Sequence, residues 1–144
     1  MELQITPYAY GERPTATPPT HQFYQVLGEQ GIRNLVSRHY DILRESSISF
    51  MFPDNDKAFA MAKQHSADFM IQISGGPDYF NQNQGAPRLV FRHAPFKIKS
   101  DDRVVWLNCY KQALLELDIP QEIVISFWNY INVFSIWMVN TPTG

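Results

Sequence analysis

Apolar side chains recur every three or four residues in four separate stretches of the chain. That spacing places each set on one face of a helix and predicts four helices, each with one buried side. The sets are Ile32, Leu35, Val36, His39, Tyr40 and Leu43; Ala62, Ser66, Phe69, Met70 and Ile73; Trp106, Tyr110, Ala113, Leu114 and Leu117; and Ile123, Phe127, Tyr130, Ile131, Phe134 and Met138.

The positions of proline and glycine support this interpretation. Residues 32–52, 54–74, 96–119 and 121–141 contain neither residue type, and each stretch is far longer than an ordinary strand. Proline and glycine destabilise a helix interior most, so their absence favours long helices that begin and end inside these stretches. We predict an all-α fold and exclude a β-sandwich or barrel, which would show turn signals every ~8–12 residues.

Three sequence signals predict where the helices end. Gly75-Gly76-Pro77 should stop the second helix, because glycine adopts a left-handed cap and proline cannot continue a helix. Ser100 is the expected N-cap of the third helix, followed by two aspartates that suit the helix dipole. Pro120 is expected in the first turn of the fourth helix, where its missing N–H does no harm.

The fourth helix raises the question of a membrane span, because residues 123–144 contain no charged side chain. Its apolar positions nevertheless share one face. The other half of the helical wheel carries polar residues, namely Ser126, Asn129, Asn132 and Ser135. This amphipathic pattern predicts a half-buried core helix and no membrane insertion.

Two segments lack helical periodicity. Residues 1–21 contain four prolines and predict an extended arm, so that the folded domain comprises residues 22–144. Residues 77–95 are interrupted by three prolines and a glycine and cannot hold a long helix. The second segment still carries the apolar residues 89–91 followed by Arg92 and His93, so it should bring a polar pair toward the core.

Composition narrows the classes of function. Hydrophobic residues make up 44% and charged residues 18% of the 144 residues, enough apolar side chains for one sizeable core. The net charge of −2, with basic residues scattered along the chain, indicates no nucleic-acid partner. The single cysteine, Cys109, excludes an internal disulfide and a multi-cysteine zinc site. We find no secretory signal and expect a cytoplasmic protein.

Among the four histidines, His93 is the candidate metal ligand. No second histidine or cysteine accompanies it at zinc spacing, so a metal there would need a cofactor that supplies the other ligands, as haem does. Tyr40, Ser66 and Trp106 lie on apolar stripes and could donate hydrogen bonds to a small polar ligand if they converge. The alternative is that all four are ordinary core residues.

Several short motifs resemble those of the truncated (two-over-two) haemoglobins. The similarity runs from about Phe23 to Asn140. An Arg-His-x-Pro-Phe element with a tryptophan thirteen residues after its histidine, behind Gly-Gly-Pro, points to the second group of that family. The matching motifs are Phe23-Tyr24, Gly28-Glu29, Leu35-Val36-Ser37-Arg38-His39-Tyr40, Phe52-Pro53, Gly75-Gly76-Pro77, Gly85-Ala86-Pro87-Arg88-Leu89, Arg92-His93-Ala94-Pro95-Phe96-Lys97-Ile98 and Trp106-Leu107.

This resemblance implies a globin-like two-over-two helical sandwich around haem b. It makes His93 the proximal iron ligand and Tyr40 and Trp106 the distal hydrogen-bond donors. Ala62 would take the place of the distal histidine of ordinary globins, and Ser66 would lie one turn further along. The remaining implied haem contacts are Phe52, Phe69 and Phe96 on the porphyrin, and Arg92 and His65 at its propionates.

The implied function is reversible binding of dioxygen, CO or NO at the iron. Oxidation of NO or redox chemistry of dioxygen or peroxide could accompany binding, with a reductase that the sequence does not identify. We expect a monomer or a homodimer. Two alternatives stay open at this point: a cofactor-free helical interaction or sensor domain, and a haem peroxidase-like enzyme.

Overall fold

The computed structural model describes residues 2–142, and these residues form helices but no β-strand. The all-α prediction is therefore confirmed. The elements in chain order are α1 (His21–Arg44), the short 3-10 helix η1 (Ser49–Met51), α2 (Asp56–Ile73), α3 (Tyr79–Gln84), α4 (Leu89–His93), α5 (Ser100–Leu115) and α6 (Gln121–Met138).

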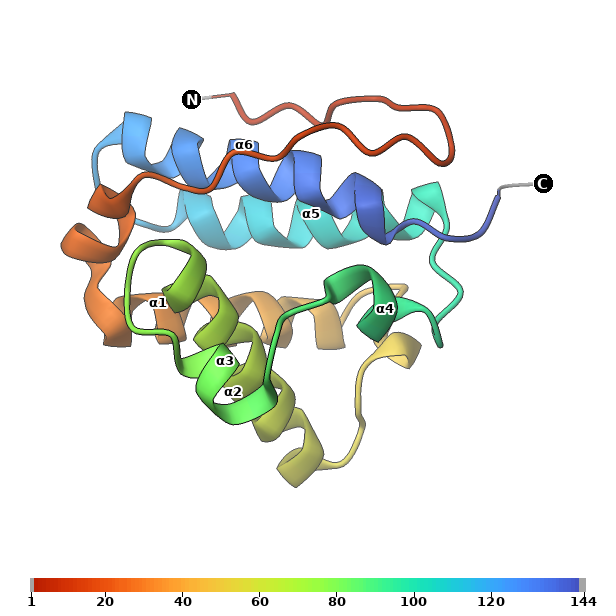
Figure 1. Cartoon of the computed structure of the whole chain (residues 1–144), viewed down its shortest axis with the longest axis horizontal. Helices are drawn as coiled ribbons and strands as arrows, with labels where there is room; N and C mark the ends of the chain where they lie inside the picture. The colour runs from red at the N-terminus through yellow and green to blue at the C-terminus, as the bar shows by residue number, and fades with distance from the viewer. Residues whose placement is uncertain (1, 143–144) are drawn as a thin grey trace.

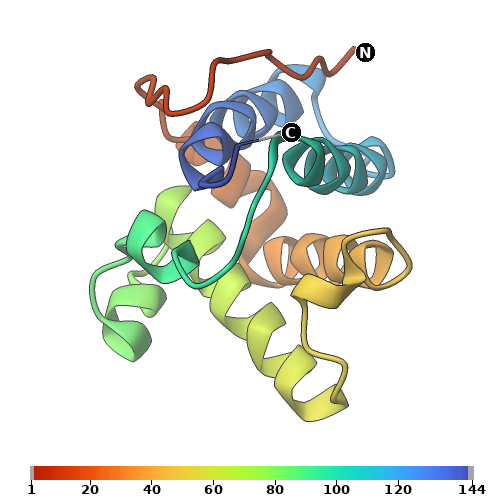
Figure 2. The same ribbon diagram turned by 90° about the vertical axis from the view of Figure 1, so that its right-hand side faces the viewer.

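The long helices form two layers (Figures 1 and 2). α5 and α6 lie side by side in one layer, and α1 packs against α2 in the other and also contacts both α5 and α6. The rings of Phe23 on α1 and Phe127 on α6 stack with centroids 4.5 Å apart and join the layers. This is the expected two-over-two arrangement, and the short helix α4 lies against α6 at one end of it.

α1 differs from the prediction at its start. It begins at His21, well before the stretch that opens at residue 32, and it runs through two glycines. Gly28 has φ 69° and ψ 176°, outside the helical region, so α1 consists of two helical segments joined at a kink. A glycine tolerates this positive φ at little steric cost, which is why the breaker bends the helix without ending it.

The three predicted helix ends have different outcomes. Gly75 has φ +95°, and the N–H groups of Gly75 and Gly76 bond the carbonyls of Gln72 and Ile71, which completes the expected glycine cap of α2. The other two predictions are each wrong by one position. Lys99, and not Ser100, is the N-cap of α5, and Pro120 is the N-cap of α6 and precedes its first helical residue.

α6 is half-buried as predicted, since ten of its 18 residues are buried. The N-terminal arm nevertheless covers part of its polar side (Figure 1), so that Asn132 is buried whereas Asn129 stays exposed. Leu3 of the arm is only 1% exposed. The Trp128 indole donates to the carbonyl of Gln4 over 3.0 Å, and Thr6 and Asn132 exchange two hydrogen bonds of 3.0 and 2.7 Å. Periodicity marked the polar face of α6 correctly, but the arm residues that bond Asn132 and Ser126 lie 126 and 106 residues away in the chain.

Arg103 on α5 forms hydrogen bonds to both the N-terminal arm and α6, and its side chain is buried, with 4% of the residue exposed. Its guanidinium donates to the Ser135 hydroxyl, the Thr6 carbonyl and the Asn132 carbonyl. The ring of Tyr8 lies 5.0 Å from the guanidinium carbon. Within residues 2–142 this buried cation has no carboxylate partner, so neutral acceptors and one aromatic ring satisfy it.

Across residues 2–142, no helix combines the length and the apolarity needed to cross a bilayer. The boundary between an arm of residues 1–21 and a domain of residues 22–144 stays a prediction, since the packed arm shares its core with the helices.

Candidate functional site

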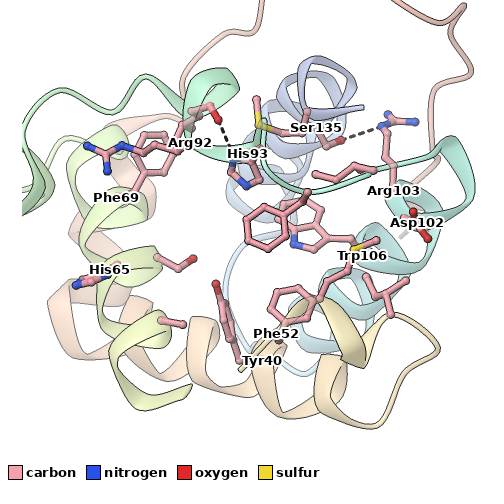
Figure 3. Close-up of a pocket in the computed structure, with 18 of the residues that line it drawn as sticks. Tyr40, Phe52, His65, Phe69, Arg92, His93, Asp102, Arg103, Trp106 and Ser135 are labelled. Carbon is pink, nitrogen blue, oxygen red and sulfur yellow. Dashed lines mark hydrogen bonds between the residues drawn. The ribbon is translucent and has the colours of Figure 1, made fainter. Parts of the chain in front are cut away.

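A cavity of about 420 Å³ lies between the two helical layers and α4 (Figure 3). All ten residues that the sequence singled out line it, although they come from six different segments of the chain. They are Tyr40, Phe52, Ala62, His65, Ser66, Phe69, Arg92, His93, Phe96 and Trp106. The wall is mostly apolar, and its volume is that of an ordinary small-molecule or cofactor site.

His93, the last residue of α4, presents its imidazole to one side of the cavity (Figure 3). Its Nδ1 lies 2.7 Å from the Leu89 carbonyl oxygen. A carbonyl oxygen can only accept, so Nδ1 carries the proton and Nε2 of the neutral ring carries a lone pair. Burial lowers the pKa of His93, and the bond to Leu89 offsets that shift in part. The ring is thus held in the tautomer and charge state of a metal ligand.

Arg92 holds the loop between α3 and α4 by hydrogen bonds to its backbone carbonyls. The Arg92 side chain donates to the carbonyls of Pro87, Gln84 and Ala86 over 2.6, 2.7 and 3.0 Å. These bonds hold the loop between α3 and α4 on the outer side of the cavity wall. Arg92 was expected at a haem propionate; its Nη1 makes no hydrogen bond among the described residues and is the group that could serve there.

Tyr40 approaches the cavity from α1, opposite His93, with its hydroxyl turned toward the centre (Figure 3). The rings of Phe52 and Phe59 lie edge-on to its ring at 5.5 and 5.8 Å and fix its position. Burial raises the pKa of the Tyr40 hydroxyl, and the neighbouring Ser66 hydroxyl lowers it in part. Tyr40 is therefore a neutral donor at physiological pH, with Ser66 next to it and Ala62 one turn away on α2.

Trp106 lines the cavity from α5, and its indole N–H has no hydrogen-bond partner among residues 2–142. The rings of Tyr110, His39 and Phe134 pack edge-on around the indole at 5.1, 5.2 and 6.2 Å. An indole nitrogen can only donate, so it is available to a polar ligand in the cavity. Tyr40 and Trp106 thus converge from different layers, as the donor hypothesis required.

The other predicted haem contacts lie around the rim and walls. Phe69 packs between the rings of Phe80 and Phe134 at 5.7 and 6.2 Å and forms part of the apolar wall. Phe96 is 46% exposed and lies at the rim. The Gln84 amide lies 3.1 Å from His65 Nε2 and donates to it, so one nitrogen of this ring is already bonded.

Sequence reasoning missed two polar groups at the cavity: His39 lies behind its wall, and Arg103 is part of its lining. His39 was assigned to an apolar stripe without a role, and its Nε2 donates to the Trp106 carbonyl over 3.1 Å. Arg103 was not singled out, although its spacing of four residues from buried Leu107 places both on one face of α5. In both cases the sequence offered one signal that could have identified the residue, namely a polar side chain on an otherwise apolar helix face.

Known globins resemble this chain in sequence. The sequence profile of the bacterial-like globins matches residues 22–140. The group 2 truncated haemoglobin YjbI of Bacillus subtilis is 27% identical over 117 residues, which cover 81% of this chain and 87% of that protein.

Two solved structures are similar over most of their length. Phosphate-bound Hell's gate globin IV superposes with a TM-score of 0.90 at 32% identity, over 96% of this chain and 87% of that one. A truncated oxygen-avid haemoglobin from Bacillus subtilis superposes with a TM-score of 0.76 at 26% identity, over 82% and 98%. The profile match spans most of the sequence and the fold agrees with it, so this chain belongs to the bacterial-like globin family and is a haem-binding globin of the truncated, group II type.

Proposed function

We propose that the cavity holds haem b and that the protein reversibly binds dioxygen, and also CO or NO, on the side of the haem opposite His93. The observation that carries this proposal is the Nδ1 bond of His93 to Leu89, which leaves the Nε2 lone pair facing the cavity. When bound, haem would supply a ferrous iron with one open coordination position. His93 would hold that iron, and the apolar walls would exclude water from it.

On the opposite side, Tyr40 and Trp106 would donate hydrogen bonds to the gaseous ligand. Dioxygen at a ferrous iron is more polar than CO, so the donors favour dioxygen. Each neutral bond contributes ~1 kcal/mol, and more when the acceptor carries charge in a dry pocket. At roughly 1.4 kcal/mol per factor of ten, two donors slow dioxygen release by one to several powers of ten. The related Bacillus subtilis haemoglobin is described as oxygen-avid, which agrees with this inference.

The proposal is tested by absorption spectroscopy of the purified protein after haem reconstitution. A Soret band is expected, and His93→Gly should weaken or abolish it until imidazole is added to replace the missing ligand. His21→Gln is the matched control, because that exposed histidine lies outside the cavity. A full Soret band in His93→Gly without imidazole would show that another residue holds the iron.

The donor roles are tested separately, by stopped-flow measurement of dioxygen dissociation. Tyr40→Phe and Trp106→Phe should each speed release roughly fivefold or more, since each removes one hydrogen bond. Tyr130→Phe removes a hydroxyl outside the cavity and should leave the rate unchanged. Unchanged rates in both cavity variants would refute the donor roles.

Slow dioxygen release favours oxidation of NO as a second candidate function. Dioxygen held in the cavity, NO and one electron give nitrate, so each turnover needs a reductant. NO consumption should then continue only while a reductant is supplied, and its loss in Trp106→Phe and Tyr40→Phe would tie it to retained dioxygen. The peroxidase-like alternative is tested by peroxide turnover against an equal concentration of free haem.

A further inference from the structure

Residues 88–99 form a basic strip on the surface, made of α4 and the segment that leads to α5. Its four cations, Arg88, Arg92, Lys97 and Lys99, are all exposed, and it contains no acidic residue. The whole chain has 12 Lys and Arg against 14 Asp and Glu, so the other 132 residues hold eight cations and 14 anions. The positive charge of an acidic protein is thus concentrated here.

Arg88, Lys97 and Lys99 of the basic strip are available to a partner, whereas Arg92 also bonds three backbone carbonyls of the loop between α3 and α4. Within residues 2–142, none of the four takes part in an ion pair. The next acidic residues along the chain, Asp101 and Asp102, begin α5, and the Asp102 carboxylate accepts from the Lys99 backbone N–H over 2.9 Å. Glu12 of the N-terminal arm shares a surface hollow with Val90 and Ala94 of the strip. Lys99 keeps its ammonium exposed beside that cap.

Two aromatic rings lie among these charges. Phe91 is 69% exposed and Phe96 is 46% exposed. The Arg88 guanidinium lies 5.1 Å from the Phe91 ring centroid and covers part of it. Arg88 has φ 40° and is the only non-glycine residue with positive φ in residues 2–142. Aromatic and arginine side chains with a charged rim are typical of protein interfaces, and backbone strain often accompanies function.

The basic strip is also the wall of the cavity. It carries His93, and Leu89, Arg92, Phe96 and Ile98 of the same strip line the cavity from the inside. A protein seated on Phe91 and Phe96 would therefore lie within a single layer of residues of the iron that His93 is proposed to hold.

We propose that the basic strip docks an acidic one-electron carrier protein of the iron–sulfur class, which reduces the haem iron from the His93 side. The inference rests on the proposed function, because it needs iron at His93. One electron leaves the reduced carrier and converts ferric to ferrous iron, and the carrier is oxidised by one electron. Opposite charges would speed the encounter, and the exposed rings would supply the small apolar centre of a transient redox complex.

The test uses the haem-loaded ferric protein and a reduced plant-type [2Fe–2S] ferredoxin, in stopped-flow experiments at about 20 mM and 500 mM NaCl. Reduction should slow about tenfold at high salt, where charges are screened within ~4–5 Å. Lys97→Glu with Lys99→Glu should slow the low-salt reaction about tenfold, and Lys97→Arg with Lys99→Arg should keep the parent rate. Lys57→Glu with Lys111→Glu changes charge equally outside the strip and should slow it less than twofold.

Other readouts separate the possible outcomes. Reduction by dithionite should be the same in all variants, because that small molecule needs no docking surface. Ferredoxin rates that are equal in the two glutamate pairs, or independent of salt, would overturn the proposal. Loss of binding to phosphatidylserine vesicles in Lys97→Glu with Lys99→Glu, without a change in the ferredoxin rate, would instead assign the basic strip to a membrane.

Failure of the proposed function is distinguishable from failure of this inference. ¹⁵N chemical shifts of residues 88–99 should move on addition of oxidised ferredoxin in the CO-bound ferrous protein. A missing Soret band would refute haem binding. Contact with ferredoxin could then still be measured, from the chemical shifts of residues 88–99 in the haem-free protein. A normal Soret band with no shift in residues 88–99 would refute docking alone.

Discussion

His39 links the wall behind the cavity to the stability of the whole protein. Its imidazole is 1% exposed, donates from Nε2 to the Trp106 carbonyl and stacks on the Tyr110 ring with centroids 3.5 Å apart. Its Nδ1 has no hydrogen-bond partner among the described residues. The rings that pack on the imidazole, those of Tyr40, Trp106 and Tyr110, are all uncharged. Burial lowers the pKa of His39 from 6.5 to about 3.

The sign of the pH effect follows from that shift. The unfolded state binds a proton below about pH 6.5, whereas the native state binds one only near pH 3. The stability gained by burying neutral His39 is thus fully present above pH 6.5 and is lost progressively as the pH falls toward 3. At 1.36 kcal/mol per pH unit, the His39 contribution to the free energy of unfolding falls by about 2 kcal/mol between pH 7 and pH 5.

Urea unfolding followed by circular dichroism at pH 5, 6, 7 and 8 measures this contribution. His39→Gln retains a donor for the Trp106 carbonyl but cannot titrate, and His39→Phe retains only the ring. The stability of the parent relative to either variant should fall by about 2 kcal/mol from pH 7 to pH 5. The haem concentration is kept equal throughout, so that linkage to haem binding is comparable.

The two variants are expected to differ from each other by a nearly constant amount at every pH, because neither titrates at residue 39. That amount combines the hydrogen bond to Trp106, which only Gln can make, with the ring packing on Tyr110, which only Phe retains, and it should not depend on pH. If the parent and His39→Gln keep the same stability difference from pH 8 to pH 5, His39 does not titrate differently in the two states and the reasoning is wrong.

Three further substitutions test the packing, each by urea unfolding. Leu3→Ala should lower the free energy of unfolding by about 2–3 kcal/mol, because Leu3 is 1% exposed beneath the arm; no loss would show that the arm is not part of the core. Asp68→Asn should cost about 2 kcal/mol, since Asp68 is buried and pairs with partly exposed Arg33 at 2.8 Å; a loss below 0.5 kcal/mol would contradict this. Gly76→Ala should cost about 1–3 kcal/mol, because its new Cβ would lie 2.6 Å from an Ile71 methyl carbon and 2.9 Å from the Ile71 carbonyl oxygen, and an unchanged midpoint would mean that this turn relaxes freely.

The sequence alone predicted the secondary structure and the residue types of the site. Helical periodicity and the spacing of proline and glycine depend on neighbours within a few residues, so α2, α5 and α6 lie inside the predicted stretches. The Arg-His-x-Pro-Phe element also lies in one short segment, which is why His93 could be named before the fold was known.

What the tertiary structure decided is which surfaces meet. Periodicity shows that Tyr40 and Trp106 each face inward, but only the packing of α1 against α5 brings them into one cavity with His93. Part of the polar face of α6 is covered because Thr6 reaches Asn132, 126 residues away. Contacts at such separation leave no local pattern in the sequence, because each partner alone is compatible with solvent, and it is the folded chain that buries them together.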